Sequence, residues 1–464
     1  MSRPNLVLGS LRELSTVSLV AGLCGAYAGV LMTTSTVLAA TGREFGGTVG
    51  VLLSIVSGVF VLIALYVGVI VIINAVDTVI AGRLRQIALL RLLGSRGRDL
   101  RRAVTRGTAV VGSVGAALGL AIGVVLSHGI RLVLVSQGTL PDTVYPIATT
   151  NLVWAFVAIA AAAALAGWLG ARPVLGVSPA AAMSGAAVPA PPRRRVSVMR
   201  AILAAIGVLG GALFLAGAGW LGETQPQIGF PMAFLGALVS GTGLLIGARF
   251  VIPAAVAMLC RLLGRDPASV VARRNALLDP LRTTRSTMGL VIGVALVTTI
   301  ASGMDALGQS VASWQLGPEQ RVQAEQVLAM TSTILICIVV ISSIIAAAGF
   351  VSTMSLTVIQ RHREIGLLRS LGFTQRQVRT MITKESVALS AAAVVLGLVI
   401  GLLFGTVGAQ SLIGGLTTGL VWGAPPITLA AIAAAGLVLV LVTSQGPARR
   451  AVRVAPVEAL RIDS

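Results

Sequence analysis

The sequence predicts an all-α polytopic membrane protein, with about 10 transmembrane helices arranged as two parallel four-helix repeats plus an inserted two-helix hairpin. Two observations predict this class. Hydrophobic residues make up 56% of the chain and charged residues 11%, whereas about a quarter of the residues in a soluble domain are charged. A motif of twelve residues, flanked each time by strongly apolar runs, occurs twice.

Each predicted span is an apolar run close to or above the roughly 20 residues that cross a bilayer as a helix. Transmembrane strands would instead show alternating segments of about ten residues, and the sequence contains no such pattern. The spans are predicted at about 15–40, 51–80, 107–135, 150–171, 201–220, 231–260, 286–303, 329–358, 385–408 and 427–445.

The net charge of +20 follows the predicted topology. If the N-terminus is cytoplasmic, nearly all of the 35 Lys and Arg residues lie in inner segments; the exceptions are Arg43, Arg131, Arg249 and Arg321. Acidic residues mark the outer segments: Glu44, Asp142, Glu223, Asp305, Glu319 and Glu325. Basic residues favour cytoplasmic loops, so both termini are predicted to be cytoplasmic. The basicity is thereby explained without nucleic-acid binding.

The repeat defines the domain organisation. Arg83–Gly94 (RLRQIALLRLLG) and Arg361–Gly372 (RHREIGLLRSLG) lie 278 residues apart and share eight of twelve residues. Similar segments, Val177–Met183 and Val454–Leu460, close each half. The predicted parts are a first four-span half at 1–183, a cytoplasmic Pro/Arg linker at 184–200, an inserted transmembrane hairpin at 201–260 and a second four-span half at 261–464.

The repeats are parallel, because an even number of predicted spans separates the two motif copies. Both copies therefore face the same side of the membrane, and parallel repeats are related by an axis along the membrane normal. One chain would then present two equivalent cytoplasmic surfaces, which suits a twofold-symmetric soluble partner.

The second motif copy predicts a helix, a turn and another helix. Its apolar residues at helical spacing form a stripe of Ile365, Leu368 and Leu371. Gly372 suits the C′ position that ends a helix. Thr374 and Gln377 form a T-x-x-Q capping box for a short second helix before the next span.

The first copy has weaker signals for the second helix. Gly94 and Ser95 take the places of the turn glycine and the capping residue, but Arg98 stands where the box requires Glu or Gln. Gly97 also disfavours helix. This helix is predicted to start less firmly.

The sequence lacks the residues of an enzyme that binds nucleotide. It has no G-x-x-x-x-G-K-[ST] motif, and its sole lysine, Lys384, lies in MITKES. His128 and His362 are isolated, and no metal-ligand spacing is present. The chain is therefore predicted to be a transport subunit without its own ATPase, driven by another subunit.

Two further stretches carry charge near apolar residues. Asn74 and Asp77 lie near the inner end of the second span; Asp77 is either an intramembrane charge on a substrate path or an interfacial partner of Arg83, and the second reading is favoured. Residues 273–293 alternate arginines with apolar residues, which suits a helix along the inner leaflet, and Asp279-Pro280 is expected to break it. Residues 1–14 suit a short interfacial helix.

The motif R-x-R-E-I-G-L-L-R-S-L-G-F-T-x-x-Q-V over residues 361–378 resembles the signature of FtsX/MacB-like permeases, the type VII or mechanotransmission group of ABC transporters. ARRNALLDPLRTTRST and the terminal ARRAVRVAPVEALR resemble that family too, and the layout is similar to ten-span bacitracin-resistance-type permeases. The resemblance implies that the cytoplasmic turn of each half contacts the ATPase. By motif, the contact residues are Glu364, Ile365, Gly366, Arg369, Gly372 and Thr374 to Val378, including Gln377, in the second half, and Gln86, Ile87, Arg91, Gly94 and Ser95 in the first.

The sequence departs from the family pattern at two features. Gln86 replaces the usual Glu and Ala88 the usual Gly, so the two ATPase contacts are expected to be unequal. The large extracellular domain usual in the family is missing, and the loops 41–50 and 304–328 stand in its place.

Three functions are open at this point. The first is the permease of an ABC transporter in a bacterial cell membrane, with two copies of an ATPase that bind ATP and Mg, exporting or extracting a hydrophobic or amphipathic substrate such as a lipid, a drug or an antimicrobial peptide. The alternative is a regulatory mechanotransmission permease that signals to an extracellular or membrane partner, such as a cell-wall hydrolase or sensor kinase. An ATPase-independent carrier is disfavoured, because buried ionisable pairs are scarce.

Overall fold

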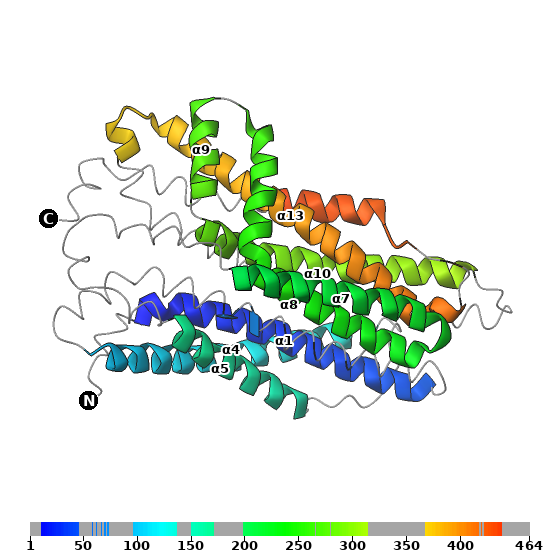
Figure 1. Cartoon of the computed structure of the whole chain (residues 1–464). Helices are drawn as coiled ribbons and strands as arrows, with labels where there is room; N and C mark the ends of the chain where they lie inside the picture. Colours follow the sequence, from blue (N-terminus) through cyan, green and yellow to red (C-terminus); the bar gives the residue numbers. More distant parts are fainter. Residues whose placement is uncertain are drawn as a thin grey trace, which may run out of the picture. The chain divides into compact units, whose positions relative to one another are not determined.

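The computed structural model describes eight stretches of the chain and a few isolated residues (58, 62, 66, 69, 70, 72, 73 and 419). The stretches are 11–45, 96–136, 150–170, 198–264, 266–278, 280–313, 367–416 and 422–438. Every regular element within them is a helix (Figure 1). The predicted all-α fold is confirmed.

Seven helices in these stretches are long and apolar enough to cross a membrane. Their apolar segments are Ser18–Val37, Gly97–Val133, Thr150–Leu169, Val198–Thr224, Ile228–Leu259, Thr287–Ala312 and Gln375–Ile413. Seven of the ten predicted spans are thus confirmed. The spans predicted at 51–80 and 329–358 lie outside the described stretches, and the one at 427–445 begins as a shorter apolar helix, Pro426–Val438.

The chain forms two compact units, Met1–Arg194 and Arg195–Ser464. Their boundary falls inside the predicted linker; the division into four parts stays a prediction. The first unit holds α1 (Leu11–Phe45), α4 (Gly97–Ser136) and α5 (Thr150–Gly170). The second holds α7 (Val198–Thr224), α8 (Pro226–Leu259), η2 (Cys260–Leu263), α9 (Pro267–Leu278), α10 (Pro280–Ser313), α13 (Gln375–Ile413) and η3 (Gly414–Leu416).

The helices extend beyond the apolar runs that predicted them. α1 already begins at Leu11, so residues 11–14 belong to the spanning helix and not to a separate interfacial one. α10 runs to Ser313 and takes in the start of the loop predicted at 304–328. Hydropathy marks only the part of a helix that suits lipid, whereas polar residues such as Arg and Gln continue a helix readily into water.

In the first unit, α1 packs closely on α4 through glycines. A Cβ atom added at Gly119 would overlap the carbonyl oxygen of Gly22, and one added at Gly123 would overlap that of Ala26. Small residues of this kind let the backbones of two membrane helices approach each other.

The second unit repeats this packing between α10 and α13. A Cβ atom at Gly397 would lie 2.7 Å from the Cβ of Val294, and one at Gly401 would lie 2.7 Å from the oxygen of Ala295. Gly397 and Gly401 stand 278 residues after Gly119 and Gly123. The sequence repeat is therefore also a repeat of helix packing.

The inserted hairpin of α7 and α8 belongs to the second unit. Buried residues of α8, among them Ala248, Ile252 and Val256, join a hydrophobic cluster with residues of α10 and α13. A single residue, Gln225, separates the two helices of the hairpin.

The two ends of the second unit differ in charge. α9 packs on the start of α13 at one end, and this end carries Arg261, Arg273, Arg274, Arg376, Arg379 and Lys384. At the other end Gly222 of α7 lies against Ser411 of α13, next to the acidic Glu223. This separation of basic and acidic residues is expected if consecutive spans cross the membrane in alternating directions. That the basic end is cytoplasmic stays a prediction.

Candidate functional site

The second motif copy ends in a glycine turn. Gly372 has φ +94°, a left-handed conformation that glycine adopts without the steric cost of a Cβ atom. The N–H of Gly372 donates to the carbonyl of Arg369 (3.1 Å), and that of Phe373 donates to the carbonyl of Leu368 (3.0 Å). These two bonds define a Schellman motif, so the prediction of Gly372 at C′ is confirmed.

The predicted capping box directly follows this turn. The N–H of Gln377 donates to Oγ1 of Thr374 (3.2 Å), and the N–H of Thr374 donates to Oε1 of Gln377 (2.9 Å). Two backbone donors at the helix start are satisfied reciprocally. The backbone between Leu368 and Gln377 is thus held by local hydrogen bonds through the whole reversal.

The prediction of a short second helix before the next span is wrong. The helix that begins at Gln375 is α13, which continues without interruption to Ile413 over 39 residues, about 58 Å. No Gly or Pro occurs before Gly397 to break it. The turn is therefore joined to a membrane-spanning helix by one continuous ladder of hydrogen bonds.

A small hydrophobic cluster holds the turn against α9. Its buried members are Ala268 and Ala272 of α9 and Val378, Met381 and Ile382 of α13. Leu368 and Phe373, which flank the glycine turn, pack against it. Part of the amphipathic segment predicted at 273–293 therefore docks α9 on α13 through its apolar residues. The predicted break at Asp279-Pro280 is confirmed, since α9 ends at Leu278 and α10 begins at Pro280.

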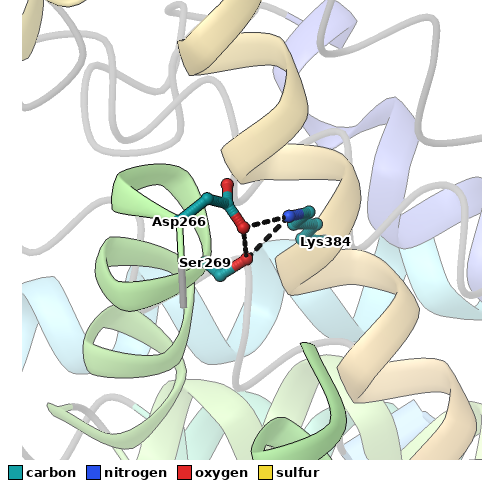
Figure 2. Close-up of polar contacts among 3 residues, drawn as sticks. All are labelled: Asp266, Ser269 and Lys384. Carbon is teal, nitrogen blue, oxygen red and sulfur yellow. Dashed lines mark hydrogen bonds and ion pairs between the residues drawn. The ribbon is translucent and has the colours of Figure 1, made fainter. Parts of the chain in front are cut away.

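A polar contact also fastens α9 to α13 (Figure 2). Nζ of Lys384 lies 2.6 Å from Oδ1 of Asp266 and 2.6 Å from Oγ of Ser269. The hydroxyl of Ser269 donates to the carboxylate of Asp266. The hydrogen bonds from Lys384 and Ser269 lower the pKa of Asp266 from 3.8 to about 2. From the sequence, Lys384 was noted only for lying outside any nucleotide-binding motif. Its contact with Asp266 was not predicted, because the two residues are 118 positions apart.

One large apolar side chain stands out at the tip of the turn. Leu371 is 79% exposed, whereas Leu368 is half-buried in the cluster. The predicted apolar stripe therefore does not continue to Leu371, because the helix ends there and the chain reverses. Leu371 was not among the predicted contact residues, although its repetition as Leu93 was a signal for it.

The structure describes only part of the predicted contact set. Thr374 and Gln377 are exposed, Arg369 is half-buried, and Val378 is fully buried (0% exposed). Val378 thus positions the turn from inside the cluster. The other predicted residues lie outside the described stretches: Glu364, Ile365, Gly366, Gln86, Ile87, Arg91, Gly94, Ser95, Asn74 and Asp77.

The first repeat begins its long helix at the equivalent position. α4 starts at Gly97, which is 278 residues before Gln375. Leu100 is buried like its counterpart Val378. The residue before the helix is Arg96, so the predicted alignment of Ser95 with the capping residue is off by one. An arginine side chain has no acceptor, and this start therefore has no capping box. Arg101 instead stacks on the ring of Trp168 in α5, 4.1 Å from its centroid.

Among the residues described, no group of three or more His, Cys, Asp or Glu side chains could hold a metal ion. That ATP and Mg bind a separate subunit stays a prediction.

Comparison with known proteins supports the repeat. A family model described as "FtsX-like permease C-terminal" matches residues 58–179 and again 336–456, together about half of the chain. The two matches begin 278 residues apart, as the motif copies do. The chain is also 31% identical over 138 residues to the "Uncharacterized ABC transporter permease YknZ" of Bacillus subtilis (strain 168). That region covers 30% of this chain and 33% of the relative.

Proposed function

We propose that this chain, which belongs to the FtsX-like permease family, couples ATP hydrolysis by a separate ATPase dimer to export or membrane extraction of a hydrophobic or amphipathic molecule. Its membership makes it a multi-pass ABC transporter permease, and such a permease works with an ATPase subunit. The number of ATPase copies, the contact and the direction of transport are the proposed parts.

One observation carries the coupling proposal. The turn at Gly372 is fixed by its own hydrogen bonds and is continuous with α13. A force applied at this turn would therefore move the whole membrane helix instead of being absorbed in a flexible loop. The exposed Leu371 gives a partner an apolar side chain to bury, which would contribute about 1.5–3 kcal/mol.

Two ATPase copies fit the repeat. Each unit begins a helix of about the same length at equivalent positions, Gly97 and Gln375. Two equivalent turns would accept the two subunits of a symmetric dimer. The absence of a capping acceptor at Arg96 supports the expectation that the two contacts are unequal.

The spans support a hydrophobic or amphipathic substrate. Exposed side chains along the spanning helices are mainly apolar, for example Leu118, Leu213 and Leu403. Such surfaces face lipid, and a molecule that moves along them must itself tolerate an apolar environment. Lipids, lipophilic drugs and amphipathic antimicrobial peptides share this property.

A signalling role remains the second candidate, and the length of α10 favours it. α10 continues to Ser313, about 15 Å past its predicted end at residue 303. If the basic end of the unit is cytoplasmic, the apolar segment Thr287–Ala312, about 39 Å long, exceeds a hydrocarbon core of about 30 Å, so the end of α10 would offer a surface to an outer partner such as a cell-wall hydrolase, or to a sensor kinase.

The coupling proposal is tested with the chain reconstituted with its ATPase in nanodiscs. Leu371→Ala should weaken ATPase binding about tenfold, because truncation of a buried interface anchor typically costs more than 1 kcal/mol. Ser370→Ala is the matched control, since the hydroxyl of this exposed side chain donates to the carbonyl of Leu367 within its own turn. Unchanged binding and unchanged substrate-stimulated ATPase activity in Leu371→Ala would refute the contact. Stimulation by a lipid or drug with movement of that molecule would favour transport over signalling.

A further inference from the structure

α9 carries a pocket beside the contact between Ser269 and Lys384 of α13. The pocket has a volume of about 420 Å³ and is lined by Gly264, Ser269, Val270, Arg273, Arg274, Leu277 and Leu278. Residues three, four and seven positions apart lie on one side of a helix, so the two arginines sit between Val270 and the two leucines. One wall of the pocket is therefore cationic and the rest is largely apolar.

The position of α9 places this pocket at the membrane surface. α9 connects two spans, which end at Leu259 and begin at Thr287. Its 12 residues extend about 18 Å, too short to cross a hydrocarbon core of about 30 Å. Figure 1 shows α9 crossing the direction of the long helices α7 and α10 instead of running along it. This orientation suits a helix that lies along the interface.

The charges around the pocket leave both arginines available. Both are exposed, and within the described part of the chain neither forms an ion pair or a hydrogen bond. Among the described residues, the acidic side chain nearest to them in sequence is Asp266, which binds Lys384 and Ser269 instead (Figure 2). In the stretches that the structure describes, the arginine pair therefore has no ion-pair partner.

The apolar lining is exposed as well. Leu278 is 68% and Val270 56% exposed. Apolar side chains exposed beside arginines at the end of a membrane span are typical of contact with the headgroup and acyl boundary of a bilayer. If the basic end of the unit is cytoplasmic, as its charge predicts, this pocket lies at the leaflet where anionic lipids are enriched.

We infer that this pocket binds an anionic phospholipid of the cytoplasmic leaflet. Arg273 and Arg274 hold the phosphate through charge-assisted hydrogen bonds, and Val270, Leu277 and Leu278 pack against the start of the acyl chains. The site is separate from ATPase coupling and needs no partner subunit. It anchors α9, and with it the Lys384 contact to α13, to the membrane surface.

The test uses the full chain in neutral detergent and native mass spectrometry with added phosphatidylglycerol or phosphatidylcholine. The wild-type protein should retain phosphatidylglycerol preferentially. The double variant R273Q/R274Q should bind it roughly 30-fold more weakly, from about fivefold for each basic residue near a membrane. The matched control is R102Q/R106Q, which removes the same charge from two exposed positions of α4; its binding should stay within about twofold of wild type, because those residues do not line the pocket.

A second arm separates the lipid from its headgroup. Leu278→Ser should weaken phosphatidylglycerol binding, because it removes apolar surface without changing charge. Leu278 is exposed, so this substitution should leave folding unchanged. Glycerophosphoglycerol, which has the same headgroup chemistry but no acyl chains, should bind far more weakly than the lipid. The inference is overturned if both double variants lose equal affinity, if phosphatidylcholine is retained as well as phosphatidylglycerol, or if the soluble headgroup binds as tightly as the lipid.

Discussion

Replacing Gly372 by alanine should open the turn that joins the second motif copy to α13. The φ of +94° costs an L-residue with a Cβ atom about 1–2 kcal/mol. No atom lies within 4 Å of the position that the new Cβ would take, so the substitution introduces backbone strain and no steric overlap. A change of this size shifts a local equilibrium by about 5–30-fold.

Hydrogen–deuterium exchange on the full chain in nanodiscs measures this shift directly. The amide of Phe373 donates to the carbonyl of Leu368 across the turn. If the turn opens locally, that amide should exchange about 5–30 times faster in Gly372→Ala than in the wild type. Gly372→Asn should fall between them, because asparagine tolerates the left-handed conformation better than alanine does.

Gly408→Ala is the control. Gly408 lies inside α13, and an added Cβ atom there also meets nothing within 4 Å. Since its backbone is helical, alanine should stabilise the helix by about 0.5–1 kcal/mol and leave exchange at Phe373 unchanged. Equal exchange in Gly372→Ala and wild type would refute the view that glycine is required by the backbone of the turn. Loss of ATPase stimulation without a change in exchange would then mean that Gly372 acts through close approach of a partner.

Three other changes test separate parts of the second unit. Thr374→Ala removes the acceptor for the N–H of Gln377 and should destabilise the start of α13 by about 1 kcal/mol, seen as faster amide exchange at Gln377. Gly401→Val places a side chain against the oxygen of Ala295 and should cost about 1–3 kcal/mol by overpacking, seen as a lower melting temperature, whereas Gly289→Ala, with open space around it, should not lower it. Asp266 should stabilise the fold fully above about pH 5, well above its ordinary pKa of 3.8, and lose this contribution as pH falls through about 2. The melting-temperature difference between wild type and Asp266→Asn should therefore be constant above about pH 5 and shrink towards about pH 2; a difference independent of pH would contradict this.

Local features of the site could be predicted from sequence because a few neighbouring residues determine them. The capping box needs only Thr374 and Gln377 at the right spacing, and the Schellman turn needs Gly372 after the last helical residue. The break between α9 and α10 at Asp279-Pro280 was predicted in the same way, because proline suits the first turn of a helix and is disfavoured in its interior.

Features that depend on distant residues were not predictable from one sequence. The contact of Lys384 with Asp266 joins residues 118 positions apart, and no pattern in the sequence pairs them. The burial of Val378 depends on α9 packing over it, which turned a predicted contact residue into an internal support. Helix ends were misjudged for another reason, because apolar runs report the thickness of the membrane and not the length of the hydrogen-bonded helix.

The two repeats share their register but differ at the point where force would enter. Gly119 makes a close contact with α1 and Gly397 an equivalent one with α10, and Leu100 and Val378 are both buried one turn into the long helix. An equal push on both turns would therefore act on equivalent lever arms. The start of α13 is held by a capping box and by the Lys384 contact. The start of α4 has Arg96 in place of a capping acceptor, with Asp99 in its first turn and Arg101 stacked on Trp168. A helix end that unfolds locally when a partner pushes on it moves the rest of the helix less. For the same movement of the ATPase, α13 should therefore move further than α4. A symmetric ATPase dimer would then produce an asymmetric movement of the membrane helices.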